Sequence, residues 1–175
     1  MRRVRQEHLR SAPLQPLGKC AIVHMDDFGS WEEGFNPYRL RSQALGPLAR
    51  HSPARYQAWD WNLRRFGPTR LVEPAEFVIV EGVSSSRKEL SDILGYRIWV
   101  DAPRDMRLAR GLERDGQKAR PLWDKWAAWE EDYVHSERPD QRADIIADGA
   151  PSLSYDPESE LVRLAKPRRI LPGNG

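Results

Sequence analysis

The chain has one cysteine, Cys20, in 175 residues, and this scarcity excludes an internal disulfide. No group of cysteines and histidines has the spacing of metal ligands, which excludes a zinc-finger type of site. A protein with a single unpaired cysteine is typical of a reducing compartment. We therefore expect a cytoplasmic protein.

Long hydrophobic runs and an excess of one charge are also missing. The longest apolar runs have the length of a strand and fall well short of the ~20 residues that a membrane span requires. The 28 Lys and Arg residues nearly balance the 26 Asp and Glu residues, and the two signs are mixed along the chain. This pattern predicts neither a membrane nor a nucleic acid as a partner.

The length suits a single domain over residues 1–175. Residues 1–18 are predicted to be an irregular start, with a helix-like piece from Val4 to Leu9 that is broken by Pro13 and Pro16. Residues 19–165 would form the core, and residues 166–175 a loose tail.

Strand-like and helix-like segments alternate along this core. Strands are predicted at residues 20–25, 76–83, 96–101, 143–147 and 161–164, and helices at 40–48, 104–114 and 121–137. This alternation is typical of an α/β fold with a mostly parallel sheet and flanking helices. Residues 76–83 are apolar on both faces, which predicts an interior strand covered on both sides.

Acidic residues end three of these strands. Asp26 and Asp27 follow the first, Glu81 the second and Asp101 the third. In one parallel sheet they would share the carboxyl edge, where ligands of α/β proteins gather. Such oxygen ligands suit Mg²⁺ shared with a phosphate. The alternative is that each acid only caps the helix that follows it.

The helix predicted after Pro103 carries the opposite charge. Arg107, Arg110 and Arg114 are three and four residues apart, so they lie on one helix face. Guanidinium groups in such a row can neutralise a phosphoryl group during transfer. The alternative is a solvated basic face that pairs with Glu113 and Asp115.

Six motifs in a fixed order resemble a known family. "HMDDF", "AWDW", "VIVEGV", "IWVDAP", "RLARGLERDG" and "ADIIADG" together resemble the uridine kinase-like branch of the P-loop kinases, which also holds pantothenate kinase and phosphoribulokinase. The resemblance covers about residues 20 to 149. It implies a three-layer P-loop NTPase-like fold, ATP and Mg²⁺ as cofactors, and phosphoryl transfer to a hydroxyl of a small acceptor, with a nucleoside as the first choice.

The resemblance also implies roles for the acids. Asp26 matches the base that takes the proton from the acceptor hydroxyl, with Asp27 as the second choice. Glu81 matches an acid near Mg²⁺ and the acceptor, so Asp27 and Glu81 become the expected metal ligands.

Basic and aromatic segments receive roles in the same way. Arg107, Arg110 and Arg114 match the lid that closes over ATP. The segment with Tyr56, Trp59, Asp60 and Trp61 lies where the family begins its acceptor pocket. These rings could stack on a base and Asp60 could accept from sugar hydroxyls, whereas ordinary core packing is the alternative. The acid that uridine kinases place just before this aromatic pair is not evident, so the acceptor stays open.

One expected motif is missing from the sequence. The family requires Gly-x-x-x-x-Gly-Lys-Ser/Thr to cradle phosphates, but the only Gly-Lys pair here, Gly18-Lys19, is followed by Cys20. We therefore expect a fold without the family's first strand, phosphate loop and first helix. Two explanations stay open: the true start of the protein lies upstream of Met1, or the gene has lost the loop. The alternative function is a non-catalytic relic that binds nucleotide weakly or serves as an interaction module.

The missing strand is central in the family's sheet. We expect either a gap in the sheet or direct pairing of the strands that end at Asp26 and Glu81. The sequence leaves open whether the chain forms a homo-oligomer.

Overall fold

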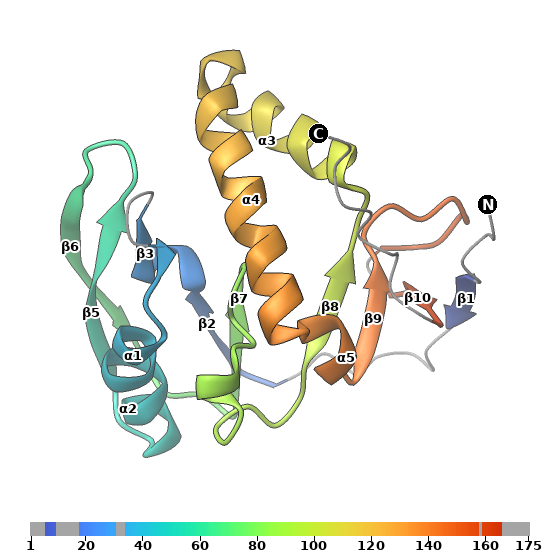
Figure 1. Cartoon of the computed structure of the whole chain (residues 1–175). Coiled ribbons are helices and arrows are strands. Elements are labelled where there is room, and N and C mark those ends of the chain that lie inside the picture. The colour runs from blue at the N-terminus through green and yellow to red at the C-terminus, as the bar shows by residue number, and fades with distance from the viewer. Residues whose placement is uncertain (1–5, 10–17, 31–33, 158, 166–175) are drawn as a thin grey trace. The chain divides into compact units, whose positions relative to one another are not determined.

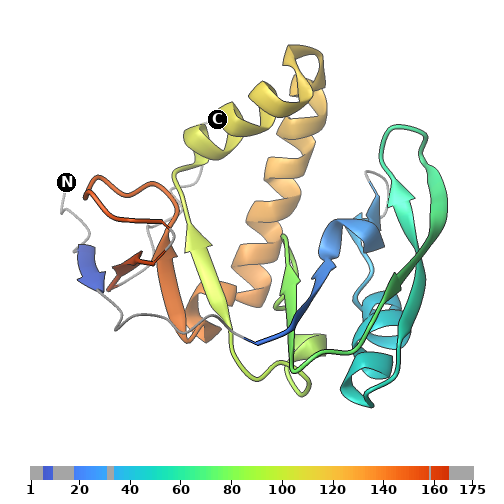
Figure 2. The ribbon, with the colours of Figure 1, turned by 180° about the vertical axis from the view of Figure 1, so that it is seen from behind.

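The computed structural model describes residues 6–9, 18–30, 34–157 and 159–165. The chain forms two compact units, of which unit 1 comprises Met1–Leu14 and Tyr96–Gly175 and unit 2 comprises Gln15–Gly95. Both units combine helices with strands (Figures 1 and 2), so the α/β class predicted from the sequence is confirmed. The predicted loose tail at 166–175 lies outside the described residues.

Unit 2 is built around a parallel pair of strands. Its elements are β2 (Cys20–His24), η1 (Met25–Phe28), β3 (Gly29–Ser30), β4 (Gly34–Phe35), α1 (Pro37–Leu40), η2 (Arg41–Leu45), α2 (Gly46–Ala49), β5 (Ala54–Asp60), β6 (Arg65–Val72), β7 (Phe77–Glu81) and η3 (Lys88–Leu90). β2 and β7 pair in parallel, from Cys20 opposite Phe77 to His24 opposite Glu81. Of the two arrangements expected from the sequence, the direct pairing of the strands that end at Asp26 and Glu81 is present in the described chain.

The core of unit 2 lies against one face of β2. Ala21 and Val23 point into it, while Ile22 and His24 alternate to the outside. Side chains of the turn, the helices and β5 complete this core; they include Met25, Phe28, Leu40, Ala44, Leu48, Ala54 and Leu90. The core therefore holds the end of β2 in place.

The β5–β6 hairpin has no counterpart in the sequence-based prediction. The two strands pair antiparallel, with a register shift between Gln57 and Trp59. This irregularity and the exposure of most of β6 remove the alternation that would reveal a half-buried strand. The hairpin contacts η1 and thereby adjoins the end of β2.

The predicted burial of β7 is wrong. Phe77, Val78 and Ile79 are 38%, 37% and 39% exposed, although their sequence is that of an interior strand. Within the described residues β7 has one hydrogen-bonded neighbour, β2, and the edge away from β2 has none. Because successive side chains of a strand point to opposite faces, both faces of β7 are partly in water.

Unit 1 contains a four-stranded sheet and the longest helix. Its elements are β1 (Gln6–Leu9), β8 (Ile98–Asp101), α3 (Arg104–Asp115), η4 (Gln117–Ala119), α4 (Arg120–Glu137), α5 (Pro139–Arg142), β9 (Ile145–Asp148) and β10 (Leu161–Leu164). The strand order is β1-β10-β9-β8, in which β8 and β9 are parallel and the other two pairs antiparallel. No helix among the described residues has the length and apolarity that a membrane crossing requires.

Two predictions about strands are wrong. The helix-like piece from Val4 to Leu9 contains a strand, because residues 6–9 pair with the edge of β10 and tertiary pairing overrides local propensity. The prediction of one sheet for the acid-tipped strands is also wrong, because β7 and β8 belong to separate sheets within the described residues.

The tryptophans of α4 lie on a partly buried face. Trp126 and Trp129 have ring centroids 5.1 Å apart, and Trp129 stacks on Tyr133 at 6.0 Å. The tryptophans remain half-buried, whereas Tyr133 and Val134 are buried. The aromatic residues therefore follow one face of α4, and the buried end of this face is the C-terminal one.

Candidate functional site

The candidate site of unit 2 lies where β2 ends in the η1 turn. Buried Met25 and Phe28 fix this turn, which carries Asp26 and Asp27 between them. Gly82 follows β7 with φ of +115°, and a Cβ at Gly82 would lie 3.0 Å from the Cβ of Met25. Glycine is therefore needed after Glu81, because it lets the end of β7 approach the turn.

Asp27 is a buried carboxylate whose two oxygens are both engaged. The Tyr56 hydroxyl donates to Oδ2 at 3.1 Å, and a guanidinium nitrogen of Arg70 lies 3.4 Å from Oδ1. Burial and the negative charge of Asp27 raise the pKa of Tyr56 to about 12. These contacts compete with the predicted metal role of Asp27, which stays a prediction.

Asp26 is exposed, in contrast to its neighbour. Its backbone carbonyl accepts a hydrogen bond of 3.1 Å from Nε1 of Trp61, which holds the residue from the hairpin side. Its carboxylate oxygen Oδ1 lies 3.8 Å from the position that a Cβ of Gly82 would take. The structure therefore brings the predicted base close to the Glu81-Gly82 pair.

His24 joins the site through Glu81, although the sequence analysis gave it no role. Nδ1 of His24 lies 2.5 Å from Oε1 of Glu81, and both side chains are about half exposed. The two residues face each other in the β2–β7 register. The outward position of His24 at the end of β2 was the signal that could have revealed it.

The four predicted acceptor residues have different environments. Tyr56 and Trp61 bind Asp27 and Asp26 as described above. Oδ1 of Asp60 accepts from the backbone amides of Asn62 and Leu63, so it shapes the hairpin turn. Of these four, Trp59 alone lines the pocket described next.

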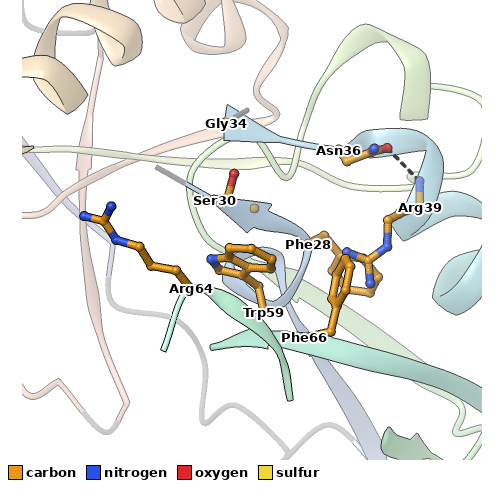
Figure 3. A pocket seen from close by; sticks show the side chains of 9 residues that line it. Phe28, Ser30, Gly34, Asn36, Arg39, Trp59, Arg64 and Phe66 are labelled. Carbon is orange, nitrogen blue, oxygen red and sulfur yellow. Dashed lines mark hydrogen bonds between the residues drawn. The ribbon is translucent and has the colours of Figure 1, made fainter. Parts of the chain in front are cut away.

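An aromatic pocket of about 350 Å³ adjoins the η1 turn. Its lining consists of Phe28, Gly29, Ser30, Gly34, Asn36, Arg39, Trp59, Arg64 and Phe66 (Figure 3). Trp59 and Phe66 meet edge to face with centroids 5.3 Å apart. Phe28 is two residues from Asp26, so the turn that carries the predicted base also forms part of the pocket wall.

The predicted lid arginines of α3 are engaged with protein groups. Arg107 pairs with Glu130, and both terminal nitrogens of Arg110 donate to the carbonyl of Gly149 at 3.1 Å. Arg114 donates to Asp115, lowering the pKa of that carboxyl group, and lies over the ring of Trp123. Their role as a lid stays a prediction.

Glu81 fits a magnesium ion by the chemistry of its carboxylate oxygens. Among the described residues no group of three or more metal-binding side chains occurs. Mg²⁺ requires fewer, because it commonly uses one or two carboxylates together with water and substrate phosphates. The exposed carboxylate of Glu81 at the β2–β7 end could supply one of them.

Comparisons with known proteins bear on this arrangement. No protein-family model matches the chain. The chain is 38% identical over 73 residues to a uridine kinase of Clostridium tetani, which covers 41% of this chain and 35% of the relative. It is 34% identical over 129 residues to a uridine kinase of Leuconostoc citreum, which covers 69% of this chain and 58% of the relative.

A solved structure shares the fold. The structure described as a possible uridine kinase from Bacillus stearothermophilus aligns with a TM-score of 0.54 at 20% identity, over 74% of this chain and 72% of that chain. These matches support a uridine kinase-like family for the chain. This uridine kinase-like chain spans 35% and 58% of the lengths of the two curated relatives, so the activity of a whole enzyme is a matter for proposal.

Proposed function

We propose that the chain is an ATP-dependent phosphotransferase that acts on a hydroxyl of a small acceptor, with a nucleoside as the first candidate. The observation that carries the proposal is the pair of carboxylates, Asp26 and Glu81, at the carboxyl end of the parallel β2–β7 pair. The aromatic pocket beside them has room for an acceptor. The two curated relatives are uridine kinases, which supports a nucleoside as the acceptor.

Asp26 is the proposed general base. Its exposed carboxylate would take the proton of the acceptor hydroxyl as the hydroxyl oxygen attacks phosphorus. Asp27, tied to Tyr56 and Arg70, holds the turn that presents Asp26. In this proposal the exposed Asp26 acts in catalysis and the buried Asp27 positions the turn.

Glu81 would hold Mg²⁺ together with water and phosphate oxygens, which leaves Asp26 to act as the base. When bound, this ion neutralises charge on the phosphate oxygens. His24 keeps the Glu81 carboxylate at the end of the sheet through their short contact. Arg110 and Arg114 would have to leave Gly149 and Asp115 to reach a phosphate, so their part requires a rearrangement within unit 1.

We propose that the 175-residue chain transfers phosphate poorly when it acts alone. We also propose that it is a cytoplasmic protein. Its sequence has no Gly-x-x-x-x-Gly-Lys-Ser/Thr, so it has no motif of backbone amides to cradle the transferred phosphate. This observation also favours the second candidate, a non-catalytic module that binds the acceptor or a nucleotide without transfer.

A transfer assay distinguishes the two candidates. The protein, in excess over the acceptor, is incubated with Mg²⁺ and ATP labelled at the γ-phosphate, using a panel of nucleosides, pantothenate and ribulose 5-phosphate. Slow transfer that falls about 100-fold or more in Asp26→Asn supports the kinase. Asp132→Asn, an exposed change on α4, serves as the matched control. The absence of transfer to every acceptor that binds would support the non-catalytic module.

A further inference from the structure

The described lining of the aromatic pocket includes two cations. It contains two guanidinium groups, those of Arg39 and Arg64, and no Asp or Glu side chain among its nine described residues. Figure 3 shows Arg39 and Arg64 on opposite sides of Trp59. A ligand that occupies this space therefore meets cations and aromatic rings.

Arg39 is a half-buried cation with neutral partners. Its guanidinium lies over the rings of Phe28 and Phe66, 5.4 and 4.6 Å from their centroids. Nη2 donates to the carbonyl of Gln57 at 2.8 Å and to Oε1 of Gln43 at 3.3 Å. Within the described part of the chain, no carboxylate lies at ion-pair distance from it.

Burial without a counter-ion is unfavourable for such a group. Removal from water lowers the pKa of Arg39. The two aromatic faces return part of the lost hydration energy, since rings attract cations. Hydrogen bonds to two neutral oxygens satisfy Nη2 but leave the charge uncompensated, so an anion brought to this position would gain from both charge and hydrogen bonding.

The pocket also has an unused donor. Nε1 of Trp59 is buried and has no hydrogen-bond partner among the described residues. An indole nitrogen can only donate, so it requires an acceptor atom. An acceptor oxygen of a ligand would satisfy this donor.

We propose that the aromatic pocket binds an anionic acceptor, a small alcohol or nucleoside that carries a carboxylate or a phosphate group, and that Arg39 pairs with this group. The proposal rests on the proposed function for the identity of the pocket as the acceptor site. The alternative is that Arg39 has only a structural role, in which Nη2 ties α1 to β5. Both side-chain hydrogen bonds of Arg39 within the described residues come from Nη2, so Nη1 and Nε can bind a ligand.

The test compares ligands that differ by one charged group. Binding of uridine is measured against that of orotidine, which adds a ring carboxylate. Binding of ribulose is measured against that of ribulose 5-phosphate, which adds a phosphate. Isothermal titration of the 175-residue protein without ATP is expected to show the anionic member of at least one pair binding about tenfold to a hundredfold more tightly. The pair that shows this preference identifies the anionic group.

Variants of Arg39 assign the preference to that residue. In Arg39→Gln the anionic and neutral members are expected to bind about equally, while Arg39→Lys retains part of the preference because it keeps the charge. Arg55→Gln, an exposed change on β5 outside the pocket, should leave the preference unchanged. Circular dichroism of each variant checks the fold.

The outcomes separate the two proposals. Equal binding within both pairs by the unaltered protein, no binding of any of the four compounds, or an equal loss for both members in Arg39→Gln would overturn the anionic pocket. A preference that depends on Arg39, in a protein that transfers no phosphate, would support the pocket and count against the phosphotransferase. Transfer to neutral uridine, with equal binding of the anionic and neutral compounds, would support the phosphotransferase and count against the anionic pocket.

Discussion

At the scale of single residues, the two adjacent carboxylates of the site have opposite environments. Asp27 is buried against Tyr56 and Arg70, whereas Asp26 is exposed beside Gly82. A general base must be accessible to the acceptor, whereas a residue that positions the turn must be held in place. The burial of the pair therefore supports Asp26 for chemistry and Asp27 for positioning.

The hydrogen bond from Tyr56 to Asp27 is predicted to stabilise unit 2. Tyr56→Phe leaves a buried carboxylate oxygen without its donor, so we expect a loss of about 1–3 kcal/mol in the free energy of unfolding. Urea denaturation measures it. Tyr38→Phe removes a hydroxyl from a side chain that is 69% exposed and should change stability little. Equal effects of the two changes would mean that the Tyr56 hydroxyl contributes nothing specific.

The sequence revealed the acids of the site better than their partners. Asp26, Asp27 and Glu81 follow apolar strands, a signal that is local in the chain. Arg70 and Arg39 reach the site through a hairpin and a helix whose placement depends on tertiary pairing, so no local pattern marks them. His24 was visible as an outward strand position but lacked a partner until β2 and β7 were paired.

At the scale of elements, one arginine ties the helical segment of unit 2 to the loop after β7. Arg41 donates to both carboxylate oxygens of Asp92, at 2.7 and 2.5 Å, and to the carbonyl of Glu89 at 3.0 Å. The hydrogen bond from Arg41 lowers the pKa of Asp92 from 3.8 to about 2. The contact thus depends on an ionised Asp92.

This ion pair predicts a specific loss of stability in acid. Because the pKa of Asp92 is lower in the folded state, its contribution is present above the unfolded value of 3.8 and is lost as pH falls through about 2. Between pH 4 and pH 2 the melting temperature of the unaltered protein should therefore fall more steeply than that of Asp92→Asn. Parallel curves for the two proteins would show that the pair does not contribute, as exposed pairs often do not.

The contact between α3 and α4 depends on a glycine. A Cβ at Gly111 would lie 2.5 Å from the ring of Trp123. Alanine favours a helix over glycine by about 1 kcal/mol, yet we expect Gly111→Ala to destabilise unit 1 by about 1–3 kcal/mol through overpacking. Gly95→Ala, which would meet no atom within 4 Å, is the control for thermal unfolding. A gain in stability from Gly111→Ala would contradict this packing.

Elements with a strong period were predictable, and those defined by pairing were not. Helices α3 and α4 and strands β2, β7, β8 and β9 agree with the segments predicted from periodicity and from the residues at their ends. The β5–β6 hairpin and β1 were missed because one has a register shift and the other is a short strand on a sheet edge. The exposure of β7 depends on its neighbours in the folded chain, and the composition of a strand does not indicate which elements these are.

At the scale of the whole molecule, the proposed site belongs to unit 2. The carboxylates, their partners and all nine pocket residues lie within Gln15–Gly95. Most of the buried apolar side chains also belong to this unit, among them Phe28, Met25, Leu40 and Leu90. Unit 2 therefore has both a core of its own and a site of its own.

Residues 15–95 produced separately are predicted to fold and to keep the ligand preference of the full chain. Their core and pocket lining come from the same segment, so the loss of unit 1 removes no pocket residue. Circular dichroism tests the fold, and titration with uridine, orotidine, ribulose and ribulose 5-phosphate tests binding. A fragment without cooperative unfolding would show that the core requires unit 1.

The central claim is that Asp26 is the base of a phosphotransferase, and a single comparison tests it most directly. Transfer of labelled γ-phosphate from ATP to the acceptor that binds most tightly is measured for the unaltered chain and for Asp26→Asn, with binding of the acceptor measured in both. We predict slow transfer by the unaltered chain and a fall of about 100-fold or more in the variant, with acceptor binding retained. Equal transfer by the two proteins would contradict the account.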